Sequence, residues 1–394
     1  MPRANSRVLQ LDILRGIAIW LVLLWHTPFR LVHHEGEDPL HWVYVAIQDI
    51  GWSGVDLFFV LSGFLVGGLL FKEIRNSGKL DVARFIFRRG FKIWPGYYVY
   101  IGMMFLSIWR REGFDSTLKQ MFPNLLHLQN YARWTPCDFT WSLAVEEHFY
   151  LALPLLLLLL IRNSKDPRRV LPALPIVATA VMVGCLAWRL FVSSEPEYLT
   201  YKSMMTQYRV DGLFFGVLLA YLHNFCHETL RKFVSHRTLI FLLAGILLVS
   251  SAIFGTAMFN KTIGYTLLYL GYGSLLLSAI FTPLESGLAG QLMQSIPCRI
   301  IAFLGFYSYS IYLWHISLRN IVFEYQKPLL IFIPPVIQWP VGMLVYLIGV
   351  TIVGYGAGAA IEMPMLALRD RLFPSKAKPI VEQDFPESMN EPAS

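Results

Sequence analysis

Long apolar stretches with few charges dominate this sequence and restrict what it can fold into. Residues 151–161 carry no charge, and residues 55–71 carry only Asp56. A run of roughly 18 or more apolar residues is long enough to cross the hydrocarbon core of a membrane. Over the whole chain 55% of residues are hydrophobic and 15% are charged, whereas soluble domains contain about 25% charged residues. The sequence therefore predicts an integral membrane protein.

We expect an all-α, polytopic transmembrane bundle of about ten spans. Their approximate limits are 9–29, 54–71, 95–110, 142–161, 171–192, 208–225, 239–258, 262–283, 301–323 and 335–358. Basic residues cluster in alternate loops, whereas the loop after the first span carries Glu35, Glu37, Asp38 and Asp49. Because lysine and arginine accumulate on the cytoplasmic side, this alternation predicts that both termini are cytoplasmic. The expected location is the inner (plasma) membrane, with multiple passes.

Residues 1–370 are expected to form one integral membrane domain. Residues 371–394, rich in Pro, Glu and Ser, are expected to be a disordered cytoplasmic tail. The second span contains Gly63, Gly67 and Gly68, which suits close helix packing in lipid. The net charge of +7 would also suit a nucleic-acid-binding protein, but the basic residues flank apolar spans and form no soluble basic domain. We therefore expect no nucleic-acid partner.

Arg15 and His26 both lie in the first expected span. They are eleven residues apart, so on an α-helix they share one face, about 20° apart, and are separated by roughly 16 Å along the axis. Arg15 would lie towards the cytoplasm and His26 near the outer end. Ionisable residues inside spans are costly and commonly mark function. Taken singly, Arg15 is also compatible with extension to the inner surface, and His26 with capping of an interfacial end.

Other ionisable residues are expected at a similar outer depth. They are Asp56 in the second span, Glu146 and Glu147 in the fourth, and Arg209 and Asp211 in the sixth. A neutral histidine beside a carboxylate is a suitable general base, because the carboxylate fixes the tautomer and stabilises the imidazolium. Adjacent glutamates diverge by 100° on a helix, so one of them must face elsewhere. Asp211 is equally compatible with a structural pair to Arg209.

A basic segment separates the second and third expected spans, and we expect it to be a loop. Its charged residues are Arg84, Arg88, Arg89 and Lys92. One interpretation is an anchor that meets anionic headgroups on the cytoplasmic side. The other is a clamp for the phosphates of a cytosolic, nucleotide-like donor. The two are equally compatible with the residues.

The ninth expected span carries hydroxyl groups ahead of a histidine, His315. The hydroxyl-bearing residues are Ser308, Tyr309, Ser310 and Tyr312, and at these spacings they can join helices by hydrogen bonds. A hydrogen-bonded core residue is the favoured interpretation of His315, with a substrate contact as the alternative. The histidines and cysteines lack the spacing of metal ligands, so no metal site is expected.

Several of these residues occur in motifs that resemble those of the acyltransferase 3 family, polytopic membrane O-acyltransferases that modify cell-envelope glycans, lipids and some small molecules. In chain order the matching segments are 11–16 (LDILRG) with a histidine ten residues further on, 54–65 (GVDLFFVLSGFL), 87–95 (FRRGFKIWP), 140–150 (TWSLAVEEHFY), 209–213 (RVDGL), 308–315 (SYSIYLWH) and 361–364 (IEMP). Each is short, but their shared order over residues 10–370 is specific.

The resemblance implies that residues 1–370 are an acyltransferase domain. It would transfer an acyl group, expected to be acetyl, from acetyl-CoA or a related thioester to a hydroxyl of a cell-envelope saccharide or lipid-linked glycan. In this interpretation His26 is the general base, with Asp56 or Glu146 as its partner and Glu147 as a further catalytic candidate. The expected substrate-binding residues are Arg15, Arg88, Arg89 and Lys92 for the donor, together with Trp141, Arg209, Asp211 and His315. No bound cofactor is expected, and the partners are acyl-CoA, the acceptor and membrane lipids.

Two residues depart from the family pattern. Lys92 stands where a third arginine is common and lacks its planar fork, and His148 replaces the usual glutamine and adds a second candidate base. Because His26 would lie outside the donor charges, transfer is expected to cross the membrane. The alternative from another class is a transporter or flippase for a lipid-linked saccharide, which also uses intramembrane charges. Succinyl or longer-chain transfer is the alternative among enzymes, and the acceptor and oligomeric state stay open.

Overall fold

The computed structural model describes residues 8–27, 50–162, 171–330 and 332–374. Within these ranges the chain folds into helices and contains no strand, which confirms the all-α prediction. The helices are α1 (Leu9–Trp25), α3 (Gly54–Ser77), α4 (Val82–Glu112), α5 (Phe114–Leu125), α6 (Trp141–Ile161), α7 (Leu174–Val192), α8 (Thr206–Arg209), α9 (Asp211–Phe225), α10 (His227–Val234), α11 (Arg237–Phe254), α12 (Ala257–Phe259), α13 (Tyr265–Ile280), α14 (Gly287–Met293), α15 (Ile296–Phe306), α16 (Ser308–Leu330), α17 (Pro335–Ala357) and α18 (Met363–Leu372). Short 3-10 or π-helical turns cover Asp138–Thr140, Lys202–Met204, Asn260–Gly264 and Gly358–Glu362.

Fewer helices than expected have the length and composition of a continuous membrane span. Among the described residues five do, and two bent helix pairs raise the number to at most seven. The five are Gly54–Ser77, Asp138–Ile161, Leu171–Val192, Ala257–Ile280 and Pro340–Leu372. The difference from ten arises because other apolar segments are short or broken: α1 has 17 residues and α9 has 15. The chain is a multi-pass helical bundle.

The ends of the chain and the first acidic loop lie largely outside the described residues. Residues 1–7, 28–49 and 375–394 belong to this part, so the cytoplasmic position of both termini stays a prediction. The helix α18 continues to Leu372, two residues into the expected tail. Phe373 then stacks on Phe87 of α4, with ring centroids 5.5 Å apart.

The basic segment after α3 is helical, and the prediction of a loop there is wrong. The Asp81 side chain accepts a hydrogen bond from the Arg84 backbone N–H at 3.0 Å, which satisfies one of the free amides at the start of α4. From there α4 runs for 31 residues. Consecutive helical residues point 100° apart, so Arg88 and Arg89 face different neighbours.

The helix α3 packs against α1, α9 and α13. Its contact with α9 is very close: a Cβ atom on Gly63 would lie 1.9 Å from the Leu213 carbonyl oxygen, and one on Gly216 would lie 2.3 Å from the Val60 carbonyl oxygen. Only residues without a Cβ allow two helix backbones to approach this far. The expected packing role of Gly63 is therefore confirmed, and α3 is held firmly within the bundle.

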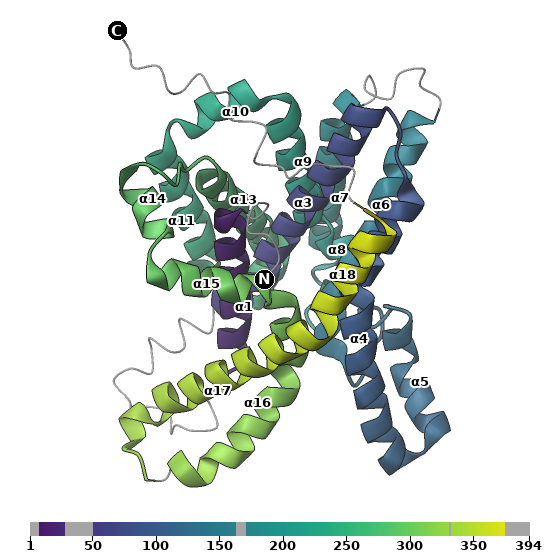
Figure 1. The fold of residues 1–394 in the computed structure, drawn as a ribbon, viewed down its shortest axis with the longest axis vertical. Coiled ribbons are helices and arrows are strands. Elements are labelled where there is room, and N and C mark those ends of the chain that lie inside the picture. Colours follow the sequence, from purple (N-terminus) through teal and green to yellow (C-terminus); the bar gives the residue numbers. More distant parts are fainter. Residues whose placement is uncertain (1–7, 28–49, 163–170, 331, 375–394) are drawn as a thin grey trace.

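A bend of 79° at Tyr307 separates α15 from α16. The helix α15 packs against α1, where a Cβ atom on Gly305 would lie 1.8 Å from the Asp12 carbonyl oxygen and one on Gly16 would lie 1.9 Å from the Ile301 carbonyl oxygen. This contact fixes the start of α16 relative to α1. The helix α16 then forms a hairpin with α17, and α4 forms another with α5; both hairpins extend from the same end of the bundle (Figure 1).

Candidate active site

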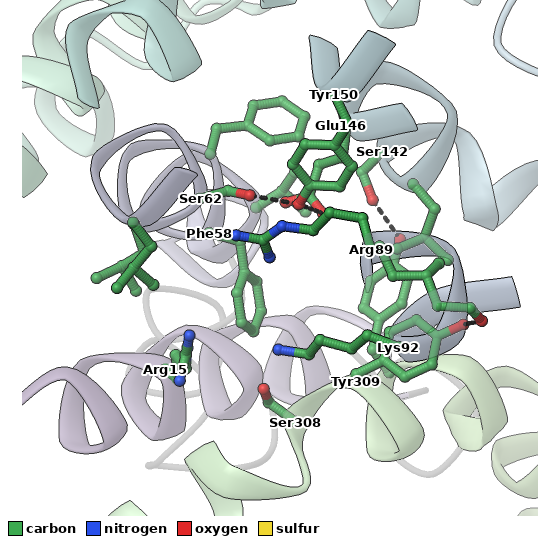
Figure 2. Close-up of a pocket in the computed structure, with 17 residues that line it drawn as sticks. Arg15, Phe58, Ser62, Arg89, Lys92, Ser142, Glu146, Tyr150, Ser308 and Tyr309 are labelled. Carbon is green, nitrogen blue, oxygen red and sulfur yellow. Dashed lines mark hydrogen bonds between the residues drawn. The ribbon is translucent and has the colours of Figure 1, made fainter. Parts of the chain in front are cut away.

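A cavity of about 770 Å³ lies between α1, α3, α4, α6 and the start of α16 (Figure 2). Four of the predicted site residues line it together: Arg15, Arg89, Lys92 and Glu146. Figure 2 shows Arg89 and Lys92 extending from α4 into the cavity, with Arg15 across from them on α1. We call this space, together with the residues that line it, the basic cavity.

Positive charge is in excess in the basic cavity. Arg15 forms an ion pair with Asp12, one turn earlier on α1, at 3.1 Å. Arg89 lies over the Tyr150 ring, 5.3 Å from its centroid, and neither Arg89 nor Lys92 reaches ion-pair distance of a carboxylate in the described ranges. Glu146 accepts a hydrogen bond from the Tyr150 hydroxyl at 2.9 Å. The cavity is therefore electrostatically suited to an anionic ligand.

Two hydroxyl groups in the lining of the basic cavity are joined by a hydrogen bond. The Tyr312 hydroxyl donates to the Phe139 carbonyl oxygen at 2.6 Å, so its oxygen accepts the Ser142 hydroxyl proton at 2.7 Å. Both Ser142 and Tyr312 line the cavity. On the other side of this pair, the Tyr312 ring lies 5.3 Å from the His315 ring, measured between centroids.

His26 and His315 form a pair next to Tyr312. Their ring centroids are 4.7 Å apart and the rings meet edge to face. The Nδ1 atom of His26 bonds the Val22 carbonyl oxygen at 2.8 Å, and that of His315 bonds the Tyr312 carbonyl oxygen. A carbonyl oxygen only accepts, so in each neutral ring Nδ1 carries the proton and Nε2 carries the lone pair.

The expected carboxylate partner of His26 is not found beside it. Neither ring of the histidine pair forms an ion pair with any carboxylate in the part of the chain that the structure describes. The backbone carbonyl of Val22 fixes the tautomer instead. His26 is half-buried and His315 is fully buried, so Nε2 of His26 is the more accessible of the two candidate bases.

A separate group of buried charges lies at the start of α9. Asp56 accepts a hydrogen bond from Arg209 at 2.9 Å, and Asp211 accepts one from Arg189 at 2.6 Å. The expected alternative of an Arg209–Asp211 pair is therefore wrong, because each partner binds a residue from another helix. We call Asp56, Arg189, Arg209 and Asp211 the buried charge cluster; all four are at most 3% exposed.

Aromatic rings enclose the buried charge cluster. The Arg209 guanidinium lies 3.5 Å from the centroid of the Tyr265 ring and 5.3 Å from that of Trp141. Cation–π contacts of this kind stabilise a desolvated arginine. Trp141, expected as a substrate contact, thus packs on Arg209 and does not line the basic cavity.

The sequence predicts two pairs of adjacent site residues, Glu146–Glu147 and Arg88–Arg89. In the structure the two members of each pair face different neighbours. Glu146 faces the basic cavity, whereas Glu147 is buried on another face of α6 and accepts a hydrogen bond from Trp94 at 3.0 Å. Arg89 faces the basic cavity, whereas Arg88 pairs with Asp370 of α18 at 3.2 Å and donates to the Phe373 carbonyl oxygen. Each pair diverges as the 100° rotation per residue requires.

Some residues of these sites were not expected from the sequence. Arg189 is the only charged residue of the expected span 171–192, so the rule that identified Arg15 would also have identified it. Ser62 and Tyr150 come from different helices and meet at 2.5 Å beside Glu146. No sequence signal distinguishes these two hydroxyls from others in the spans.

Curated proteins similar to this chain include bacterial O-acetyltransferases. The chain is 26% identical to the peptidoglycan O-acetyltransferase OatA of Listeria monocytogenes over 82% of this chain and 52% of that protein. It is 26% identical to the O-acetyltransferase OatA of Staphylococcus aureus over 72% and 49%, respectively. For the putative peptidoglycan O-acetyltransferase YrhL of Bacillus subtilis the identity is 25%, over 77% and 47%. The chain thus spans about half the length of these relatives.

No solved structure matches the chain. A family model described as an acyltransferase domain matches residues 8–357, a range that contains the basic cavity, the histidine pair and the buried charge cluster. By that match, this multi-pass membrane protein belongs to the acyltransferase 3 family.

Proposed function

We propose that the chain is a membrane O-acyltransferase that moves an acyl group, expected to be acetyl, from a cytosolic acyl-CoA to a hydroxyl of a cell-wall or other envelope saccharide. Family membership and the names of the relatives support O-acetyl transfer and the saccharide acceptor. The acyl-CoA donor is supported by the excess positive charge of the basic cavity. Inner-membrane location with both termini in the cytoplasm remains part of this proposal.

The observation that carries the proposal is the alignment of charges, hydroxyls and histidines along one path. Arg89 and Lys92 line the basic cavity together with the hydrogen-bonded Ser142 and Tyr312, and the His315 ring packs next to Tyr312. In the proposal, the donor phosphates contact Arg89, Lys92 and Arg15. The acyl arm then extends past the Ser142–Tyr312 hydrogen bond towards the histidine pair.

His26 is proposed as the general base. Its Nε2 lone pair takes the proton of the acceptor hydroxyl while the hydroxyl oxygen attacks the thioester carbonyl carbon. The carbon–sulfur bond then breaks, and the thiolate of CoA leaves with the proton that His26 returns. The Val22 carbonyl keeps the reactive tautomer in place, and His315 is proposed as a positioning residue that packs against the His26 ring.

The reaction is testable with purified protein in proteoliposomes, acetyl-CoA labelled in its acetyl group and cell-wall saccharide fragments. Wild-type protein is expected to label the saccharide, and His26→Ala to abolish labelling while its yield and elution volume stay unchanged. His236→Ala, which removes an exposed histidine, is the matched control and should keep full activity. Full activity in His26→Ala would remove this residue from the mechanism. Movement of a lipid-linked saccharide without labelling would favour the transporter.

The direction of transfer is testable with membrane vesicles of defined orientation. Inverted vesicles expose the cytoplasmic face, so acetyl-CoA added outside should support transfer only in these vesicles. Right-side-out vesicles prepared from the same cells are the control. Transfer that occurs only in right-side-out vesicles would contradict a cytosolic donor.

A further inference from the structure

A second cavity lies on the other side of Arg89 and Tyr150, which line both cavities. It lies between α4, the end of α5 and α6, and its space, part of which is open to the outside, is about 550 Å³. Its polar lining includes His127, Glu147 and His148. Neither His127 nor Glu147 has a role in the proposed path of the acyl group.

His127 has an unusual backbone conformation. Its φ angle is 55°, and it is the one residue other than glycine with a positive φ in the described ranges. A side chain makes this left-handed conformation unfavourable, and such strain is concentrated at ligand-binding and active sites. The residue is held by its ring, which stacks on Tyr97 with centroids 4.3 Å apart.

Two buried residues that line this cavity, His127 and Glu147, have polar atoms without a hydrogen-bond partner in the described ranges. His127 and Glu147 are each 8% exposed. Both ring nitrogens of His127 lack a hydrogen-bond partner among the described residues, and so does the Oε1 atom of Glu147. Burial, with a contribution from His148, lowers the pKa of His127 to about 4, so the ring is neutral at neutral pH and offers one donor and one acceptor. Unpaired buried polar groups are costly and mark a missing ligand or water.

The entrance of the second cavity is apolar and lies on the outer surface of the bundle. Leu126, Leu151 and Tyr98 line it and are 52%, 46% and 42% exposed. Leu151 lies on α6, a helix long and apolar enough to span a membrane, so its exposed side chain is expected to contact lipid chains. A ligand that enters here therefore passes from lipid into a polar interior.

We propose that this second cavity binds the uncharged, hydroxyl-bearing head of a membrane lipid. Hydroxyl groups can donate to Oε1 of Glu147 and both donate to and accept from the neutral His127 ring. Arg89 and Glu147 both line the cavity and carry opposite charges, so the lining as a whole attracts neither an anionic nor a cationic head over an uncharged one. The apolar entrance accommodates the lipid chains.

The proposal is testable by native mass spectrometry of the full chain in detergent. The probes are a monoglucosyl diacylglycerol, phosphatidylglycerol, phosphatidylethanolamine and free glucose. The glucosyl lipid should bind saturably and more tightly than the other three. Stronger binding of either charged lipid would overturn the assignment of the head, and equal binding of free glucose would overturn the lipid part. Lipid binding that does not saturate would show non-specific association and would refute the proposed lipid site.

Variants at the entrance and in the interior of the second cavity test whether the lipid binds there. Leu126→Trp should block the entrance and weaken glucosyl-lipid binding at least about tenfold, whereas Ile176→Trp, a change at a residue that is 73% exposed on α7, should leave it unchanged. His127→Asn removes ring contacts but tolerates a positive φ, so it should fold and weaken binding about fivefold, as expected for one neutral hydrogen bond. Equal affinity in all three variants would overturn the proposal.

Discussion

The basic cavity and the buried charge cluster both hold arginines inside the helical bundle, but they differ in how those arginines are paired. In the cluster, Arg189 and Arg209 each bind an aspartate from another helix, at 2.6 and 2.9 Å. In the cavity, Arg89 and Lys92 have no such partner among the described carboxylates, and the nearby Glu146 is engaged by Tyr150. The same residue types therefore form a closed set of ion pairs in one place and line an open cavity without such pairs in the other.

The difference shows that a charge within a span does not by itself indicate a substrate contact. A desolvated ion is tolerated when a partner and further hydrogen bonds compensate it, as in the cluster. An arginine that lines an open cavity keeps part of its solvation and its capacity to bind a ligand. Pairing across helices separates the two cases, and the following predictions test that distinction.

The largest effect is expected from a break in the buried charge cluster. Asp211→Ala leaves Arg189, which is fully buried, without its carboxylate. Removal of one partner of a buried pair costs about 3–5 kcal/mol, so the variant should unfold at a clearly lower temperature in detergent. Thermal unfolding followed by fluorescence-detected size exclusion measures this.

A double variant distinguishes lost pairing from a simple loss of packing. Asp211→Ala combined with Arg189→Met removes the whole ion pair, and replacement of both partners is far less damaging than removal of one. The double variant should therefore recover much of the lost unfolding temperature. Wild-type stability in Asp211→Ala alone would contradict the assigned role of the pair.

The next largest effect is expected in the basic cavity, on donor binding and not on stability. Arg89→Ala should raise KM for acetyl-CoA about tenfold, because a charge-assisted hydrogen bond contributes about 1.5–3 kcal/mol and about 1.4 kcal/mol corresponds to a factor of ten. Its unfolding temperature should change little. Initial rates at varied acetyl-CoA concentrations measure the effect.

The adjacent Arg88 provides the matched control for this variant. Arg88 pairs with Asp370, a residue that is 55% exposed, and exposed pairs contribute at most about 1 kcal/mol. Arg88→Ala should therefore change KM for acetyl-CoA by less than about twofold. An equal rise in both variants would show that the two arginines act together as a clamp, as the sequence pattern allowed.

The smallest effect is expected from salt. The Debye screening length falls from about 10 Å at 0.1 M to about 3 Å at 1 M ionic strength. Salt therefore weakens the attraction between the basic cavity and the donor phosphates, and KM for acetyl-CoA should rise severalfold over this range. The buried charge cluster is shielded from solvent, so the difference in unfolding temperature between wild type and Asp211→Ala should stay nearly constant. A KM that does not respond to salt would argue against phosphate binding in the basic cavity.

The sequence predicts the class of fold and the residue types of the site because both depend on local patterns. Apolar runs identified the helices, and charges within them identified Arg15, Glu146 and Arg209. The pairing within the buried charge cluster could not be predicted in this way. It depends on how α3, α7 and α9 pack against one another. The glycines that let α3 and α9 approach closely do not indicate which charged side chains meet.

Helix boundaries explain the remaining differences. The helix α4 includes the basic segment, so the 100° rotation per residue turns Arg88 and Arg89 towards different neighbours. A basic loop does not predict this divergence. The 79° bend at Tyr307 was also not expected, because 301–323 has the composition of one continuous span. His315 shows the opposite case, since its hydrogen bond to a main-chain carbonyl agrees with the favoured interpretation of a bonded core histidine.

The bend at Tyr307 has a consequence for the basic cavity. Because α16 begins at Ser308, which lines the cavity, the first turn of this helix lies beside the cavity. A helix start carries a partial positive charge of about half a unit from its aligned peptide dipoles. Unlike Arg89 or Lys92, this charge belongs to the main chain and cannot be removed by a side-chain substitution. Even a chain stripped of all three basic side chains would thus keep some electrostatic preference for anions at this end of α16.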